Sequence, residues 1–260
     1  MAKTLHHISD DFLNIRGTFK VAGVVNVGTH SSLVRRSNGR YLLLDSYTLE
    51  GEALAVVQAA TDGGALLDGI LNLHPFHTVH VPALHAQFPD APLHGTPRHR
   101  EKAPDLPWSE PDTQDPALFE QFADDLQFTV PEGVDFISGN EQVHFSSVLC
   151  YHPASRTLHV DDTFNYLGGG GLLGLTGLGD TVSFHPTLAR ALQKRAGAAR
   201  EFESWAHATI ERWRDAQNLC AAHTAALIGV ENQGASLHER LLAALEKISP
   251  VLDKHESRYG

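Results

Sequence analysis

The chain has 260 residues, 42% of them apolar, which is enough for one sizeable hydrophobic core. The 31 acidic residues outnumber the 20 lysines and arginines, and the formal charge of −11 disfavours a nucleic-acid partner, because cations bind phosphate backbones. Only two cysteines are present, the N-terminal residues are not those of a signal peptide, and no apolar run reaches the length of a membrane span. We therefore expect a soluble, cytoplasmic protein without a membrane partner.

The first third of the chain reads as strands followed by a helix. Three strands are predicted over residues 18–25, 31–36 and 40–45, the last two joined by turn residues. Thr48 can cap a helix that runs to Ala60. A short apolar strand of the buried kind follows over residues 69–73.

The middle of the chain contains the one compositional break. A helix over residues 81–90 and a strand over 91–94 precede residues 97–116, which hold five prolines and many charges. Long segments of this composition are usually loops, so we expect a loop insertion here that could cover a binding site. Strands are predicted to follow over 126–129 and 134–138.

The last part of the chain is predicted to alternate strands and helices. The predicted strands are 144–151, 157–160 and 219–222, the first two forming a hairpin, and the predicted helices are 186–195, 199–218 and 236–248. Ser236 and Glu239 have the spacing of a capping box at the start of the last helix.

Histidine is the unusual residue of this composition, with 17 copies. His74, His77 and His80 follow the buried strand 69–73, and loops after buried strands are where functional sites gather. Neutral imidazoles are ligands for zinc and iron. The competing interpretation is structural: the three side chains could cap the strand, complete the core and face solvent.

Further polar residues stand at other predicted strand ends. Asp161 and Asp162 follow strand 157–160, where at most one of the two is expected to enter a site, since adjacent residues of a strand face opposite sides. Paired aspartates after a strand are also common turn residues. His144 begins a strand and His223 ends one, and each alone is unremarkable.

Other motifs carry less weight. Gly169, Gly171 and Gly174 satisfy the spacing of a dinucleotide-binding loop, but no helix is predicted to follow, so a glycine-rich loop beside the site is the better interpretation. Cys150 and Cys220 lie in apolar strands and are expected to be buried, inert thiols.

The order of these elements resembles the metallo-β-lactamase-fold superfamily over roughly residues 12–248. The opening strands that end in Leu44-Asp45-Ser46 resemble the segment in which those proteins carry a strand and then Asp-Thr-Gly. Residues 74–80, HPFHTVH, stand in the place of the first metal motif, His-x-His-x-Asp-His. His144, the strand ending in Asp161-Asp162, and Ala222-His223 resemble the positions of the later metal ligands.

The chain departs from that motif in a way that bears on function. When the motif is aligned from His74, its second His becomes Phe76, its Asp becomes Thr78 and its last His becomes Val79. A histidine-rich site is recovered only if His77 and His80 take over. A one-metal site or an empty pocket therefore fits better than a two-metal site.

The resemblance implies one α/β domain over residues 1–260, in which two mixed β-sheets pack face to face with helices on the outer faces. It implies a metal-dependent hydrolase of ester-like, thioester or similar bonds that acts on a small molecule, and the departures from the motif lead us to expect one zinc or iron ion rather than two. The alternative is a metal-free, non-catalytic descendant that binds a small ligand or a partner. The candidate metal ligands are His74, His77, His80, His144, Asp162 and His223.

Overall fold

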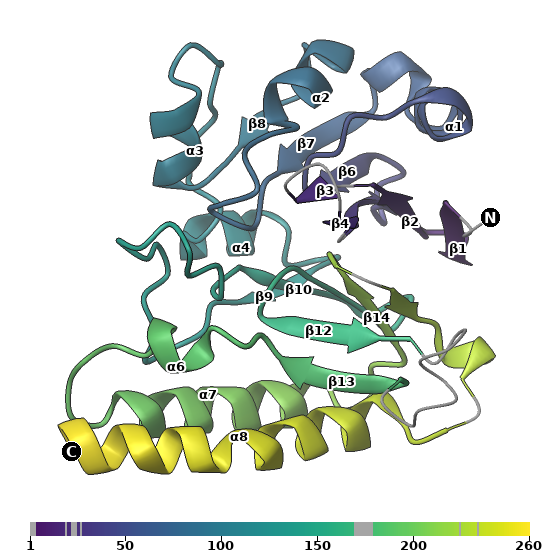
Figure 1. Ribbon diagram of the computed structural model, residues 1–260. Coiled ribbons are helices and arrows are strands. Elements are labelled where there is room, and N and C mark those ends of the chain that lie inside the picture. The colour runs from purple at the N-terminus through teal and green to yellow at the C-terminus, as the bar shows by residue number, and fades with distance from the viewer. Residues whose placement is uncertain are drawn as a thin grey trace. The chain divides into compact units, whose positions relative to one another are not determined.

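The computed structural model describes residues 4–18, 20–21, 25–26, 28–168, 179–223, 225–232 and 234–260. The chain divides into two compact units (Figure 1). The first unit comprises Met1–Gln127 with His152–Ser155, and the second comprises Phe128–Tyr151 with Arg156–Gly260. The glycine run at 169–178, with its three motif glycines, lies outside the described residues.

The first unit is built on a six-stranded mixed sheet of order β1-β2-β5-β6-β7-β8. The strands are β1 Leu5–Ser9, β2 Phe12–Gly17, β5 Thr29–Arg35, β6 Tyr41–Leu44, β7 Leu67–Leu71 and β8 Leu93–His94. Pairing is antiparallel from β1 to β6 and parallel from β6 to β8. The carboxyl ends of three parallel strands therefore gather at one edge of this sheet.

Helices α1 Gly51–Ala60 and α2 Val81–Gln87 pack on one face of the six-stranded sheet. The first unit also contains α3 Pro97–Lys102, α4 Pro116–Gln121 and a 3-10 turn η1 at Asp62–Gly64. Leu43, Ile70 and Leu93 of the sheet join Val57 of α1 and Leu84 of α2 in one buried cluster. Each such side chain stabilises the fold by about 1.5–3 kcal/mol when it leaves water.

The start of the first unit differs from the sequence prediction. The predicted strand 18–25 is replaced by two short paired strands, β3 Lys20–Val21 and β4 Val25–Asn26. Helix α1 begins after Glu50 without a side-chain cap. Thr48, the predicted cap, instead lies with its Oγ1 2.8 Å from Nδ1 of His80.

The proline-rich segment also differs from the prediction. Its first residues form helix α3 rather than a loop, because Pro97 occupies the first turn, where its missing N–H is not needed. Thr96 and His99 complete a reciprocal capping box at the same end. The proline-rich segment therefore begins with a short helix.

The second unit contains a five-stranded sheet of order β15-β14-β11-β10-β9 and a separate hairpin. The sheet strands are β9 Gln127–Thr129, β10 Leu149–His152, β11 Thr157–Val160, β14 Asn218–Ala221 and β15 Ala226–Leu227, and the hairpin strands are β12 Phe164–Leu167 and β13 Thr181–Phe184. Strands β11 and β14 are parallel, with Val160 opposite Ala221. Two large mixed sheets with helices confirm the predicted α/β class.

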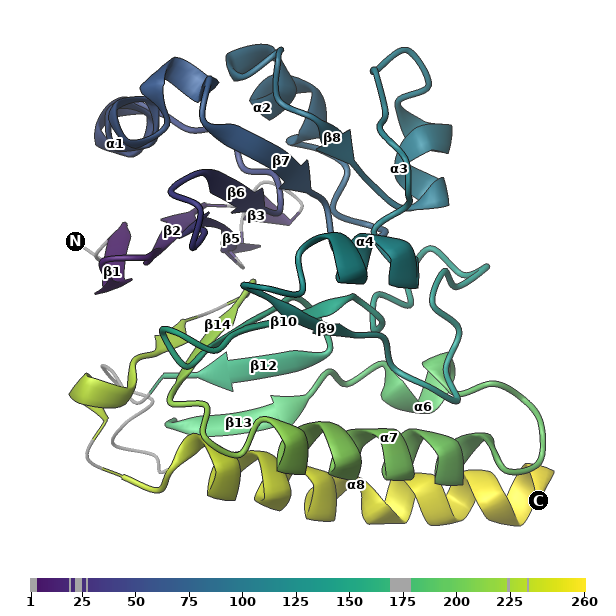
Figure 2. The ribbon, with the colours of Figure 1, turned by 180° about the vertical axis from the view of Figure 1, so that it is seen from behind.

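Helices α7 Ala198–Arg212 and α8 Leu237–Tyr259 lie side by side (Figures 1 and 2), and α8 also packs against β13. Two short helices, α6 Leu188–Ala191 and η2 Gly229–Glu231, complete the second unit. Phe202 of α7 is fully buried, with its ring 5.5–5.6 Å from those of Phe145, Phe184 and Trp205. These aromatic contacts anchor α7 in the core of the second unit.

Several predicted boundaries in the second unit are wrong. Residues 134–138 form no strand and contribute only a bridge from Val134 to Leu192. Helix α6 is shorter than predicted, and α7 ends at Arg212 rather than residue 218. The capping box of α8 is confirmed, but the helix continues through Pro250 to Tyr259. No helix in the described part of the chain has the length and apolarity needed to cross a bilayer.

Candidate functional site

In the first unit, polar side chains link the carboxyl ends of the three parallel strands. Asp45 follows β6, and its Oδ1 accepts a hydrogen bond from the backbone N–H of Leu73 at 2.8 Å. Ser46 donates to Asn72 Oδ1 at 2.6 Å, and Asn72 Nδ2 donates to the carbonyl of His94 at 2.9 Å. These buried bonds hold the residues that follow β7 in a fixed position.

His74 and His77 lie together directly after this polar link. His74 is fully buried, and its ring stacks on the ring of His77 with centroids 4.1 Å apart. The backbone N–H of Phe76 donates to His74 Nδ1 at 3.1 Å, which leaves the proton of the neutral ring on Nε2. The structure therefore brings together two of the three clustered histidines.

The third histidine of the cluster, His80, has a different local setting. It stands at the N-terminus of α2, with its Nδ1 beside the Thr48 hydroxyl and its ring edge-on to that of Tyr47, 5.2 Å between centroids. Burial lowers the pKa of His80, and the nearby His77 lowers it further. His80 thus holds the segment before α1 in place through Tyr47 and Thr48, so that Thr48 contacts His80 instead of capping the helix.

In the second unit, Asp162 and His223 are direct neighbours. His223 Nε2 lies 2.9 Å from Asp162 Oδ1. The pairing follows from the parallel register of β11 and β14: Val160 is opposite Ala221, so residues two positions further along are again level. Asp162 is almost fully buried, whereas His223 is about one-fifth exposed. An imidazole and a carboxylate therefore meet at the end of two adjacent strands.

The segment that carries Asp162 is fixed by hydroxyl groups. Thr163 Oγ1 donates to the carbonyl of Phe145 at 3.0 Å and lies 3.1 Å from Ser147 Oγ. Of the two adjacent aspartates, Asp162 is the one beside His223, while Asp161 is equally buried. The hydroxyl bonds hold the turn in the conformation that presents Asp162 to His223.

Two further histidines belong to this part of the second unit. His144 Nε2 donates a hydrogen bond to the backbone carbonyl of Glu141 at 2.6 Å. Burial lowers the pKa of His185, Asp162 opposes this change, and His223 and His144 reinforce it. Three histidines thus share the electrostatic surroundings of Asp162.

The sequence analysis did not single out two buried or partly buried histidines, His185 in the second unit and His99 in the first. His185 directly follows β13, the same strand-end position that singled out His144 and His223, so that pattern could have found it. His99 lies inside the segment predicted as a loop; it is buried in α3, and burial lowers its pKa to about 4, against the opposing charge of Asp45. His99 is therefore neutral at pH 7.

The chain has no match among protein-family models and none among curated protein sequences. Solved structures do match. A metallo-β-lactamase from Erythrobacter litoralis has a TM-score of 0.58 at 15% identity, covering 94% of this chain and 96% of that one. DIM-1 metallo-β-lactamase exposed to ceftazidime gives 0.57 at 15%, covering 94% and 97%.

A third match, FIM-1 from Pseudomonas aeruginosa in its mono-zinc form, has a TM-score of 0.56 at 14% identity, covering 95% of this chain and 96% of that one. Such low identity with near-complete coverage establishes the fold. The chain has the metallo-β-lactamase fold in a divergent form, as the order of its elements predicted. It also carries histidine and aspartate side chains that could bind a metal ion.

Proposed function

We propose that the protein is a metal-dependent hydrolase that holds one divalent ion, zinc or iron, and acts on an ester-like or thioester bond of a small molecule. The observation that carries the proposal is the contact between His223 Nε2 and Asp162 Oδ1 at 2.9 Å. Two residues predicted as ligands from their positions at strand ends meet there. Of the six candidate ligands, His144, Asp162 and His223 belong to the second unit, and His74, His77 and His80 belong to the first.

The chemistry of the donor atoms in the second unit fits a metal ion. Zinc takes imidazole nitrogens and carboxylate oxygens at about 2.0–2.2 Å, and two donor atoms 2.9 Å apart can serve one ion. Both donors are aligned by the register of β11 and β14 rather than by a mobile loop. Such alignment limits the reorganisation that binding requires.

A bound ion would supply Lewis acidity and lower the pKa of a water molecule to about 7. The protein residues would hold the ion and orient the substrate. Asp162 provides a buried negative charge next to His223. His185 accepts the backbone N–H of Thr187 through Nδ1 at 3.3 Å, so its neutral ring carries the proton on Nε2. That proton is available for donation to an oxygen of a bound substrate.

The test is the metal content of protein purified without chelator. We expect about one zinc, iron or manganese ion per chain in the unaltered protein, with chelator-sensitive hydrolysis of a thioester probe. Asp162→Asn and His223→Ala should lose the ion. His207→Ala, which removes an exposed histidine of α7, should retain it. Equal metal content in all four proteins would refute the proposed site.

A specific observation favours the second candidate, a metal-free protein that binds a small ligand. Phe76 stands where the family motif has a histidine, and the Arg98 guanidinium lies 4.3 Å from the centre of its ring. A cation at this point is unfavourable for a neighbouring metal ion. In addition, Nδ1 of His74 accepts the Phe76 amide, so coordination through Nε2 would require loss of the ring proton. Absence of metal even after reconstitution would establish this candidate over the first.

A further inference from the structure

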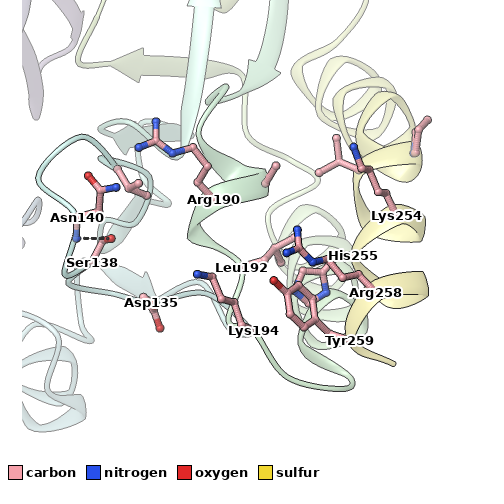
Figure 3. Close-up of a pocket in the computed structure, with 14 residues that line it drawn as sticks. Asp135, Ser138, Asn140, Arg190, Leu192, Lys194, Lys254, His255, Arg258 and Tyr259 are labelled. Atoms are coloured by element: carbon pink, nitrogen blue, oxygen red, sulfur yellow. Dashed lines mark hydrogen bonds between the residues drawn. The ribbon is translucent and has the colours of Figure 1, made fainter.

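A concave site lies within the second unit, formed by different residues from the histidine–aspartate group. It is a pocket of about 810 Å³ between the last turns of α8, the segment around α6, and the loop that follows Gly133 (Figure 3). Ligand pockets typically have volumes of roughly 300–1,000 Å³, so this one is large enough for a small organic molecule. Its apolar walls include Leu192 and Val251.

The charges around this pocket are strongly asymmetric. Arg190, Lys194, Lys254 and Arg258 line it, against a single carboxylate, Asp135. The whole chain has the opposite balance, with a formal charge of −11. Within the described part of the chain, none of these four cations forms an ion pair, whereas other arginines of the second unit do, such as Arg195 with Glu201. The pocket thus concentrates positive charge that the protein itself does not neutralise.

Helix electrostatics explain only half of this charge. Lys254 and Arg258 lie near the C-terminus of α8, where cations favourably oppose the helix dipole. Arg190 lies in the last turn of α6, but this helix has only four residues and therefore a weak dipole, and Lys194 lies beyond its end. Figure 3 shows Arg190 across the pocket from the α8 residues. Cations from separate elements around one cavity indicate an anionic ligand.

The floor of the pocket offers a polar atom and an aromatic ring. His255 is 7% exposed, and its Nε2 donates to the carbonyl of Gln193 at 3.0 Å. Its Nδ1 is buried and has no hydrogen-bond partner among the described residues. The Tyr259 ring lies beside it, 4.8 Å between centroids, with the Arg258 guanidinium 5.1 Å from the same ring. A buried polar atom without a partner is costly unless a ligand or water satisfies it.

We propose that this pocket binds a small phosphorylated organic molecule with at least two negative charges. Arg190, Lys194, Lys254 and Arg258 would hold the phosphate groups, since guanidinium and ammonium groups form strong, charge-assisted hydrogen bonds with phosphate oxygens. His255 Nδ1 would meet a polar atom of the ligand. Tyr259 and the apolar walls would contact its organic part. This inference is independent of the proposed hydrolase function, because it uses none of the proposed metal ligands.

The test is isothermal titration calorimetry of the full chain with three probes: pyrophosphate, adenosine diphosphate and adenosine. We expect saturable binding of pyrophosphate, tighter binding of adenosine diphosphate and none of adenosine. The double variant Arg190→Glu/Lys254→Glu should weaken pyrophosphate binding by roughly tenfold or more. The control, Arg214→Glu/Lys247→Glu, makes the same change of charge on α8 and just beyond the end of α7, outside the pocket, and should bind normally.

The two double variants also distinguish specific binding in the pocket from a general attraction of anions to positive charge on the protein. An equal loss of affinity in both double variants would overturn the proposal, as would failure of pyrophosphate to bind. Tyr259→Ala supplies a second measurement: it should weaken adenosine diphosphate more than pyrophosphate, because only the former has a ring to stack. Circular dichroism melts of every variant confirm that loss of binding does not arise from unfolding.

Discussion

Asp45 bridges two parallel strands of the first unit, because its carboxylate Oδ1 accepts the backbone N–H of Leu73 at 2.8 Å. The residue stands directly after β6 with φ of 58°, a conformation that side chains other than Asn and Asp rarely adopt. Both its backbone and its side chain are therefore specialised for this position. The residues that follow β7, including His74, depend on this bond for their placement.

Replacing Asp45 with alanine should destabilise the protein by about 1–3 kcal/mol, because a buried N–H loses its acceptor and alanine tolerates a positive φ poorly. The substitution Asp45→Asn keeps an oxygen acceptor and a residue type that tolerates a positive φ, so it should reduce the free energy of unfolding much less. Urea denaturation with chelator present measures both without interference from metal. Equal destabilisation by the two substitutions would show that the charge, rather than the hydrogen bond, matters.

Arg36 links two carboxylates of the first unit and makes stability depend on pH. It bonds to Asp125 Oδ2 at 2.9 Å and to Asp68. Burial opposes ionisation of both carboxyls. The pKa of Asp68 is nevertheless lowered by hydrogen bonds from Arg40 and Arg36, and that of Asp125 by hydrogen bonds from Ser37 and Arg36. Folding therefore favours the ionised forms.

The sign of the pH effect follows from these lowered pKa values. Their stabilisation is fully present above the unfolded-state pKa of the carboxyls, about 4, and is lost as the pH falls through the folded-state values. Arg36→Met should reduce the free energy of unfolding by about 1–3 kcal/mol at pH 7, because Asp125 then keeps Ser37 but loses its arginine, and Asp68 keeps Arg40 and Asn38 but loses one of its two arginines. The difference in the free energy of unfolding between this variant and the unaltered protein should become smaller as the pH falls.

Arg35→Met is the matched control for this experiment. Arg35 pairs with Asp11 at 3.5 Å, but both side chains are more than 40% exposed, so the substitution should change stability by less than about 1 kcal/mol. Urea unfolding from pH 7 downwards measures both variants. A difference for Arg36→Met that does not change with pH would contradict the electrostatic explanation.

Local sequence patterns predicted many of the helices and strands, whereas features that depend on contacts between distant parts of the chain could not be predicted. Strand β11 occurs at its predicted residues, and the capping box of α8 was recognisable from Ser236 and Glu239. Helix α3 was missed because prolines usually mark loops, although Pro97 at a helix start is favourable. Helix α7 ends before Trp213, whose ring lies 5.6 Å from that of Tyr151, a contact between distant parts of the chain that no local pattern records.

The site shows the same division between local and non-local information. The positions of Asp162 and His223 at strand ends were predictable, but their contact depends on the pairing of β11 with β14, which lie about 60 residues apart in the chain. His80 belonged to the predicted cluster, yet its contact with Thr48 is a property of the fold. Sequence order identified candidates, and strand pairing decided which of them meet.

The aromatic core of the second unit should be sensitive to loss of volume. Phe202→Ala should reduce the free energy of unfolding by about 3–5 kcal/mol, because the ring is fully buried among three aromatic neighbours and its removal leaves a cavity. Val230→Ala truncates a side chain that is 90% exposed and should have little effect. Urea denaturation followed by tryptophan fluorescence reports on this core through Trp205.

The start of α8 offers the last test, because a single hydroxyl serves one of its terminal amides. Ser236 Oγ accepts the N–H of Glu239 at 3.2 Å, and the Glu239 carboxylate accepts the N–H of Ser236 at 2.7 Å. Ser236→Ala should cost about 1 kcal/mol, whereas Ser236→Asn should retain the cap and most of the stability. Ser249→Ala, inside the same helix, should have no cost, since alanine has the higher helix propensity. Thermal melts that rank Ser249→Ala below Ser236→Ala would contradict the role of the cap.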